Sequence, residues 1–213
     1  MAWDCATGNG QVAAGLAKYF PRVIASDASQ SQIDAAVAHP NIEYRVATAE
    51  RSGLTDQSVD LITVGQAFHW FDEQRFMLEA RRLLRREGVL AIWCYKHSVV
   101  NDACDAIVDT LYRDIVGEFW QPERLIVEQG YSAVAMPGAP VAVPEFTMSL
   151  KWHAADMLGY LRTWSACKYY ETKTGSDPVD EISAGLTSAW GEGKRRVAWP
   201  LAIRASRPNS LLE

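Results

Sequence analysis

Several features are scarce in this sequence of 213 residues, and each scarcity excludes a class of protein. No apolar run approaches the roughly 20 residues that a helix needs to cross a bilayer, so no membrane partner is expected. The four cysteines form no C-x-x-C pair and do not cluster with histidine, which predicts no metal site and reduced thiols in a cytoplasmic protein. Basic residues number 21 against 26 acidic ones and form no stripe, so nucleic acid is not an expected partner.

The first hundred residues alternate between two kinds of apolar pattern. Short runs rich in β-branched residues predict buried strands at 23–26, 42–46, 61–64 and 89–93. Helical patterns lie between them at 11–19, 29–38 and 73–85, and Gly88 is expected to stop the last helix. This alternation predicts an α/β fold with a doubly wound, mostly parallel sheet of seven strands, the first of them shortened.

The second half has a different pattern. Asn101 is expected to cap a helix that runs to about residue 116, and Pro122 starts another that ends near Gly130. Strict alternation at 145–152 and 197–203 predicts half-buried antiparallel strands at one edge of the sheet. Residues 154–192 between them are predicted as two helices that form a cap. We therefore expect a single domain over 1–213, with a cofactor-binding half (1–100) and a substrate and cap half (101–213).

A glycine-rich turn at residues 4–11 follows a short apolar start and opens an alanine-rich helix. Gly8 and Gly10 allow a tight turn and a close approach to a ligand, and Asp27 ends the next strand, where it can accept hydrogen bonds from a ribose diol. Together they predict a nucleoside-containing ligand at the carboxyl end of the sheet. The alternative is that the glycines only make the turn and Asp27 only caps the following helix.

The sequence leaves two kinds of nucleoside open. Residues 8–13 satisfy the dinucleotide pattern G-x-G-x-x-G/A, which would suit a nicotinamide-dependent oxidoreductase. Asp4, four residues before Gly8, would repel a pyrophosphate but would suit a cationic ligand. S-adenosylmethionine carries a sulfonium and an ammonium group and no phosphate, so the acid favours that ligand.

At several positions the chain resembles the class I S-adenosylmethionine-dependent methyltransferases of type 11, and within them small-molecule enzymes similar to trans-aconitate methyltransferase. Residues 4–10 resemble the family's acid-x-Gly-x-Gly-x-Gly motif, with Ala6 in place of the first glycine, and Asp27 matches its ribose-binding acid. Residues 48–50, 56–60 and 66–71 are similar to its later motifs, with Thr48 where an aspartate is usual. Residues 160–165 and 199–201 also resemble that subgroup.

The resemblance implies a Rossmann-like methyltransferase fold and methyl transfer from S-adenosylmethionine, leaving S-adenosylhomocysteine, to a small-molecule acceptor. The implied cofactor-binding residues are Asp4, Ala6, Gly8, Gly10, Asp27, Ala28, Thr48, Ala49 and Gln66. The implied substrate-binding residues are His69, Trp70, Arg162 and Trp164, and His69 is the candidate catalytic residue.

The acceptor could be activated or anchored in different ways. His69 would act as a general base for a hydroxyl or an amine, or it would only shape the pocket wall. A carboxylate acceptor, which the resemblance favours slightly, would need no base and would be held by Arg162 or Arg204. The aromatic residues Trp152, Trp164, Tyr169 and Tyr170 either line an apolar pocket or pack in the core.

The segment before the first motif is short. Members of the family carry a few dozen residues there, whereas three residues precede Asp4 here. A cofactor without that covering segment is expected to be more exposed to solvent and to bind more weakly. A methyltransferase-like protein that binds the cofactor without turning it over is therefore a second hypothesis.

Overall fold

The computed structural model describes residues 1–209, which form two compact units. Unit 1 consists of Met1–Tyr95, Ile126–Pro144 and the chain from Ala202 on, and unit 2 of Lys96–Leu125 and Glu145–Leu201. The chain thus leaves unit 1 after Tyr95, returns to it at Ile126 and again at Ala202. Within the described residues, no helix has the length and apolar character that a bilayer crossing requires.

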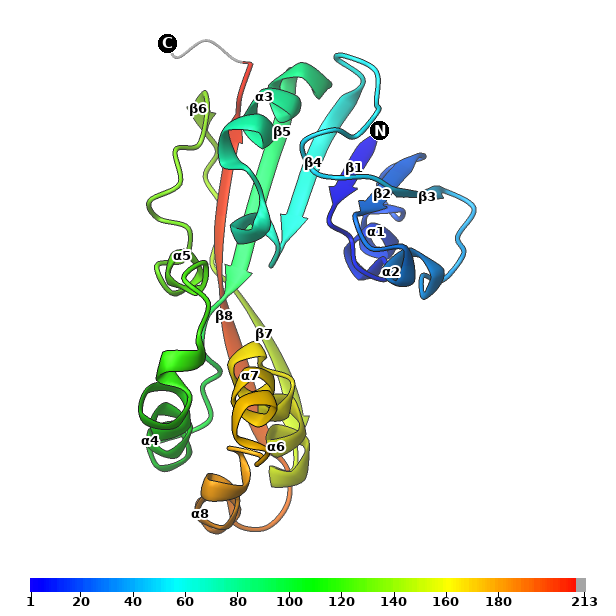
Figure 1. Ribbon diagram of the computed structural model, residues 1–213. Helices are drawn as coiled ribbons and strands as arrows, with labels where there is room; N and C mark the ends of the chain where they lie inside the picture. The colour runs from blue at the N-terminus through cyan, green and yellow to red at the C-terminus, as the bar shows by residue number, and fades with distance from the viewer. Residues whose placement is uncertain (210–213) are drawn as a thin grey trace. The chain divides into compact units, whose positions relative to one another are not determined.

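Unit 1 is built on a mostly parallel sheet, as the sequence predicts (Figure 1). Strands β1, β2, β3, β4 and β5 run parallel where they pair, in the order β3-β2-β1-β4-β5, and β8 and β6 follow β5. The strands span Ala2–Cys5, Val23–Asp27, Ile42–Val46, Val59–Gly65, Leu84–Tyr95, Arg195–Arg207 (β8) and Ala139–Pro140 (β6). The short β6 pairs antiparallel with the end of β8, and the sequence does not predict this strand. Within residues 1–209 the sheet therefore has eight strands instead of the predicted seven.

The central strand β1 is only four residues long, and all four are buried. Trp3 is completely buried and donates a hydrogen bond from Nε1 to Ser26 Oγ at 2.8 Å, so its polar atom is satisfied. Burying a side chain of this size contributes roughly 1.5–3 kcal/mol. Helix α3 (Glu73–Leu83) packs Phe76 and Leu83 into the same core. Helices α1 (Gln11–Leu16) and α2 (Gln30–Asp34) follow β1 and β2.

Two sequence predictions about α3 are wrong. The helix ends at Leu83 instead of residue 85, and Gly88 lies inside β5 instead of stopping the helix. The cause is tertiary: Leu84 pairs with Val59 of β4 and is completely buried. Pairing and burial there outweigh the helical pattern of the local sequence. Helices α1 and α2 are likewise shorter than predicted.

In unit 2, α4 (Asp102–Thr110) begins as predicted. The Asn101 side chain accepts a hydrogen bond from Cys104 N at 2.9 Å, which caps the helix. A π-helical turn, Leu111–Ile115, continues it to about the predicted end. Helix α5 (Arg124–Glu128) follows Pro122 and ends before Gly130.

The predicted pair of cap helices is three helices: α6 (Ala154–Arg162), α7 (Ser165–Thr174) and α8 (Asp180–Trp190). The extra break occurs at Trp164, whose backbone is extended (φ −62°, ψ 136°) and precedes α7. Its indole packs against Tyr112, Trp120 and Tyr160. The helical side-chain pattern of the sequence continues through Trp164, so the pattern does not predict this break.

Strand β7 (Phe146–Trp152) pairs antiparallel with β8, from Phe146 opposite Leu201 to Trp152 opposite Arg195. The pairing agrees with the alternation in the sequence. The apolar face is more exposed than predicted: Phe146, Met148 and Leu150 remain 43–53% exposed. Trp152, by contrast, packs against Trp199 and Tyr160.

The close packing of Gly10 against Tyr44, at the turn into α1, can be tested by substitution. Gly10 has φ +90°, and a Cβ there would meet the phenol ring of Tyr44. Gly10→Ala combines this overlap with an unfavourable backbone, so we expect it to lower the free energy of unfolding by about 2 kcal/mol or more. Urea unfolding measures the loss.

Gly15→Ala is the matched control. Gly15 lies inside α1, and nothing comes within 4 Å of the added Cβ. Higher helix propensity should raise stability by about 0.5–1 kcal/mol. Equal destabilisation by both variants would contradict the assignment of Gly10 as a packing constraint.

Candidate functional site

The loop after β1 has an unusual backbone. Ala6, Gly8 and Gly10 all have positive φ, at 54°, 58° and 90°. Ala6 pays a steric penalty that a glycine would not, of order 1–3 kcal/mol for such strained conformations. Strain of this kind is commonly found beside binding sites, and the loop opens directly onto a cavity.

Asp27, at the end of β2, connects this loop to the next one. Its Oδ2 accepts a hydrogen bond from Gly8 N and its Oδ1 from Ser29 N, both at 2.9 Å. The carboxylate therefore orders the entrance to α2, in line with the alternative interpretation that Asp27 serves the following helix. It also faces a cavity. A carboxylate oxygen accepts more than one hydrogen bond, so the same group retains capacity for a ligand.

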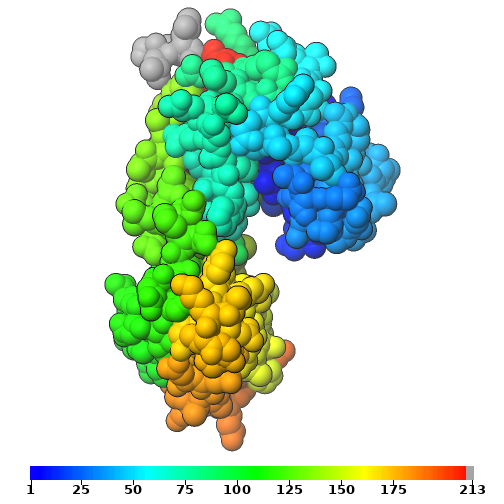
Figure 2. Space-filling view, in the orientation of Figure 1, coloured from blue at the N-terminus to red at the C-terminus, as the bar shows by residue number. Residues whose placement is uncertain are grey.

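A cavity of about 550 Å³ lies at the carboxyl ends of the unit 1 strands. In the space-filling view the surface is hollowed where the blue N-terminal segments meet the cyan residues around β4 (Figure 2). The cavity is lined by Ala6, Gly8, Asp27, Ala28, Gln32, Ala47, Thr48, Ala49, Glu50, Gly65, Gln66, Ala67, Trp70 and Phe71. The structure thus brings most of the predicted cofactor residues together around one space.

Asp4 and Gly10 belong to the predicted cofactor set but do not line this cavity. Gly10 instead leaves room for Tyr44. Asp4 is 1% exposed and accepts hydrogen bonds from Thr63 Oγ1, at 2.7 Å, and from Thr7 Oγ1. Burial raises the pKa of Asp4 from 3.8 to about 6, against the lowering effect of both hydroxyls.

Six of the lining residues have no functional assignment from the sequence: Gln32, Ala47, Glu50, Gly65, Ala67 and Phe71. Glu50 has a visible role: its Oε1 accepts a hydrogen bond from Asp72 N at 3.1 Å, so it joins two loops at the cavity. For Ala47, Gly65 and Ala67 the available signal is position, because they end or follow strands whose carboxyl ends meet at one edge. Gln32 lies inside α2, where this signal does not apply.

Gln66 directly follows β4 and has a φ of 55°, a conformation rare for a residue with a side chain. Two hydrogen bonds of 2.8 Å hold it there, from its backbone N to Trp93 O and from Tyr95 N to its Oε1. The neighbouring strand β5 thus fixes the residue that the family resemblance assigns to the cofactor.

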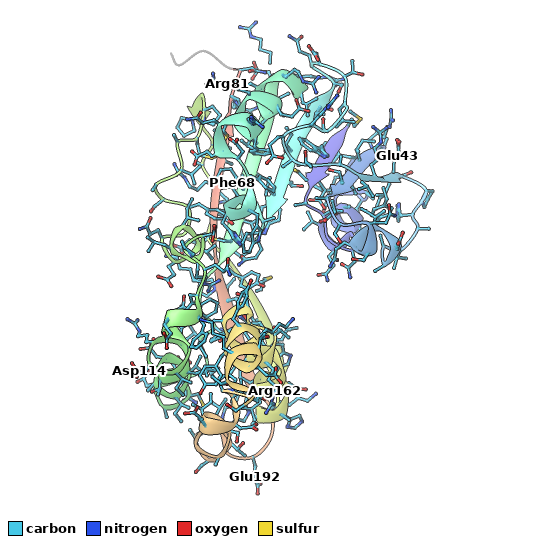
Figure 3. The ribbon with its side chains drawn as sticks, viewed as in Figure 1. Glu43, Phe68, Arg81, Asp114, Arg162 and Glu192 are labelled. Carbon is cyan, nitrogen blue, oxygen red and sulfur yellow. The ribbon has the colours of Figure 1, made fainter. Side chains whose placement is uncertain are left out.

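His69 and Trp70 lie in a short 3₁₀ turn, Phe68–Trp70, anchored by the buried Phe68 (Figure 3). Trp70 lines the cavity with 60% of its surface exposed. The two rings of His69 and Trp70 lie 4.7 Å apart between centroids. His69 Nδ1 is 3.0 Å from the hydroxyl of Tyr131. His69 is therefore next to the cavity wall without being part of it.

The remaining predicted substrate residues are held by other protein groups. Arg162, labelled in Figure 3, forms ion pairs with Asp177 and Asp180 in unit 2. Arg204 Nη1 donates to three backbone carbonyls in unit 1. Trp164 belongs to an aromatic cluster with Tyr112, and these contacts fit a packed core. Neither guanidinium is presented by the cavity lining.

Among residues 1–209, no group of three or more His, Cys, Asp or Glu side chains is arranged so that it could hold a metal ion. The four cysteines are buried and none forms a disulfide. Burial raises the pKa of the Cys5 thiol well above its ordinary value, which disfavours the reactive thiolate.

The doubly wound sheet and a cavity at the carboxyl ends of its strands are typical of α/β proteins that bind a ligand at this edge of the sheet. Comparison with known proteins narrows this class. A family described as a methyltransferase domain matches residues 3–92. A Dictyostelium discoideum protein named as a methyltransferase is 35% identical over 193 residues, covering 89% of this chain and 73% of its own length.

Two further relatives agree. An uncharacterized methyltransferase of Schizosaccharomyces pombe is 38% identical over 168 residues, which are 73% of this chain and 64% of that protein. A solved structure from Anaeromyxobacter dehalogenans, titled as a type II methyltransferase, is 42% identical with a TM-score of 0.91, covering 100% of this chain and 90% of its own. The chain belongs to the class I methyltransferase family.

The buried Asp4 predicts a pH-dependent stability. The folded state holds the proton more tightly than the unfolded state, because the folded pKa of about 6 exceeds 3.8. As the pH falls from 7 through 6 towards 4, the ligand-free protein should therefore gain up to ~3 kcal/mol relative to Asp4→Asn. Urea unfolding of both proteins across this pH range measures the difference.

Other titrating groups, such as Asp60 with its lowered pKa, are present in both proteins and cancel in this comparison. If the free energies of unfolding of the wild type and of Asp4→Asn change with pH in parallel, Asp4 does not have the raised pKa.

Proposed function

We propose that the protein transfers a methyl group from S-adenosylmethionine to a small-molecule acceptor. The observation that carries this proposal is the charge of the cavity wall: its described lining residues include Asp27 and Glu50 and no lysine, arginine or histidine. A dinucleotide would bring a doubly charged pyrophosphate to such a wall, whereas a sulfonium nucleoside brings positive charge. The cavity of about 550 Å³ is also within the range of small-ligand sites.

The residues present fit the parts of such a ligand. Asp27 is placed to accept hydrogen bonds from the ribose diol while it holds Gly8 and Ser29. Ala47, Thr48 and Ala49 form a narrow wall suited to the flat adenine ring. Gly8, without a Cβ, lets the ligand approach the loop backbone.

The methyl donor supplies an already activated carbon, so the chemistry is one in-line displacement. The nucleophile forms a bond to the methyl carbon, and the electrons of the carbon–sulfur bond remain on sulfur as a neutral thioether. The protein mainly has to align the two partners and exclude water, and orientation supplies most of the rate. On the segment that follows β4, Trp70 would orient the acceptor and Gln66 the cofactor, since both line the cavity.

Asp27 provides the first test of the cofactor assignment. Asp27→Ala removes charge-assisted hydrogen bonds worth roughly 1.5–3 kcal/mol each, so we expect affinity for S-adenosylhomocysteine to fall about 100-fold or more. Asp27→Asn keeps one carbonyl acceptor for the loops, so its affinity for S-adenosylhomocysteine should fall less. Isothermal titration calorimetry measures all three proteins.

Asp34→Ala is the control, because this carboxylate lies on the adjacent α2 and contacts Gln30 of the same helix. Its affinity should equal that of the wild type. Unchanged affinity in Asp27→Ala would overturn the ribose role. Binding of NAD in place of S-adenosylhomocysteine would overturn the cofactor, and binding without turnover would favour the non-catalytic hypothesis.

The effect of replacing His69 distinguishes the possible classes of acceptor. The two arginines proposed for a carboxylate are held by Asp177, Asp180 and backbone carbonyls, so we infer an acceptor that must lose a proton, such as a hydroxyl or an amine. His69→Ala should then lower kcat about 100-fold or more and leave the affinity for S-adenosylhomocysteine near normal.

The measurement is S-adenosylhomocysteine release with a panel of alcohols, phenols, amines and carboxylic acids. Turnover confined to carboxylic acids, with His69→Ala fully active, would show that the acceptor arrives ionised and that His69 only shapes the wall.

A further inference from the structure

We propose that the open edge of β7 pairs with the same edge of a second copy of this chain, so that two molecules form a symmetric dimer through one continuous sheet. The proposal does not depend on the proposed methyl transfer. It starts from the position of the strand. β7 pairs with β8 on one side (Figure 1), and within residues 1–209 no strand lies on its other side. Such an edge presents unpaired backbone groups that another strand can bind.

The side chains of β7 are exposed on both faces of the strand. Phe146, Met148 and Leu150 share one face, and 49%, 43% and 53% of their surfaces are exposed. The polar residues between them are exposed as well. Lys151 is the one charged residue of the strand, so charge protects this apolar edge only at one end. The strand therefore has the features of a site for pairing with another strand.

The contacts of β8 show which backbone groups of β7 point to the open edge. Ala198 exchanges two hydrogen bonds with Val99, at 2.8 and 2.9 Å, so its N–H and C=O point away from β7. Hydrogen-bonded and non-hydrogen-bonded pairs alternate in an antiparallel ladder. Ser149, which lies opposite Ala198, therefore directs its own N–H and C=O outward. Thr147 and Lys151, two positions away on either side, share this orientation.

The position of Pro200 agrees with this assignment. Pro200 lies opposite Thr147, at a place where the ladder between β7 and β8 requires no N–H from β8. The outward N–H and C=O groups thus come from alternate residues of β7, and a strand that runs antiparallel beside this edge can bond to all of them.

Charge selects the register of the pairing. Lys151 lies opposite Arg196 of β8, and like charges directly opposite each other destabilise a strand pair. Glu145 directly precedes β7, and within residues 1–209 no ion pair engages Glu145 or Lys151. A second copy with the two-fold axis at Met148 places the partner's Glu145 opposite Lys151. The same contact recurs on the other side of the axis.

The same register also matches the apolar faces. It places Phe146 opposite the partner's Leu150 and Met148 opposite the partner's Met148, so the half-exposed side chains gain apolar neighbours. An axis one residue later would separate Glu145 from Lys151 and lose the charge match. Because a two-fold contact uses the same edge on both molecules, association through it stops at the dimer.

Analytical ultracentrifugation of the full chain between about 1 µM and 1 mM tests the proposal, because one strand pairing is a small interface and weak association is expected. The wild type should sediment as a monomer at the low end of this range and increasingly as a dimer at the high end. Ser149→Pro removes an outward N–H and leaves the ladder to β8 intact. We expect it to raise the dimer Kd about tenfold or more.

Charge reversal tests the register. Glu145→Lys and Lys151→Glu each turn the two opposite-charge contacts of the dimer into like-charge contacts, so each should raise the dimer Kd about tenfold. The double variant should restore the wild-type Kd. Glu171→Lys is the matched control, because it makes the same change of net charge as Glu145→Lys at an exposed position of α7. It should leave the Kd unchanged.

Three results would overturn the proposal. The first is a monomer throughout the concentration range, which would mean that solvent or a different partner meets this edge. The second is a dimer with the same Kd in Ser149→Pro as in the wild type. The third is a double charge reversal that dimerises no more tightly than the single ones. The charge variants decide this even if Ser149→Pro folds poorly, since Glu145 and Lys151 are exposed.

Discussion

The candidate site depends on one carboxylate that ties two loops together. Asp27 accepts from Gly8 N and from Ser29 N, so the turn after β1 and the entrance to α2 have a fixed separation at the cavity. The loop that this bridge holds contains Ala6, whose positive φ is unfavourable for a residue with a side chain. The same group faces the cavity, so the interaction that orders the site is also available to recognise its ligand.

The sheet was predictable because its signals are local. Short β-branched runs interrupted by helical patterns specify buried parallel strands, and β2, β3 and β4 appear where those runs lie. The errors occur where distant contacts decide. Leu84 is drawn into β5 by its pairing with β4, and Trp164 breaks a helical region while its ring packs with Tyr112. No window of sequence contains both partners of such contacts.

The candidate site likewise has residues that local sequence signals predict and residues whose role only distant contacts decide. Gly8 and Asp27 could be placed at the cavity because a glycine turn and a strand end mark them in the sequence, and Gln66 because its segment resembles the family. The arginines could not be judged in this way, since residue type says what a guanidinium can bind and only the fold says what already binds it. Arg204 is occupied by the carbonyls around Tyr131, and Arg162 by two aspartates. The contacts of Tyr131 with Phe68 and His69 likewise have no local signal, because these residues are more than sixty positions away.

Charge connects the buried acid to the proposed ligand. Asp4 lies two residues before the lining residue Ala6, and its burial makes ionisation costly, as its pKa of about 6 indicates. Thr7 and Thr63 offset only part of this cost, and the cavity wall adds the further negative charges of Asp27 and Glu50. A cation bound nearby would lower the free energy of all three carboxylates at once, whereas a phosphate would raise it. The ligand-free protein therefore carries an electrostatic cost at this site, and the proposed sulfonium nucleoside would relieve it, so the acidity of the site would favour such a ligand over one that carries a phosphate.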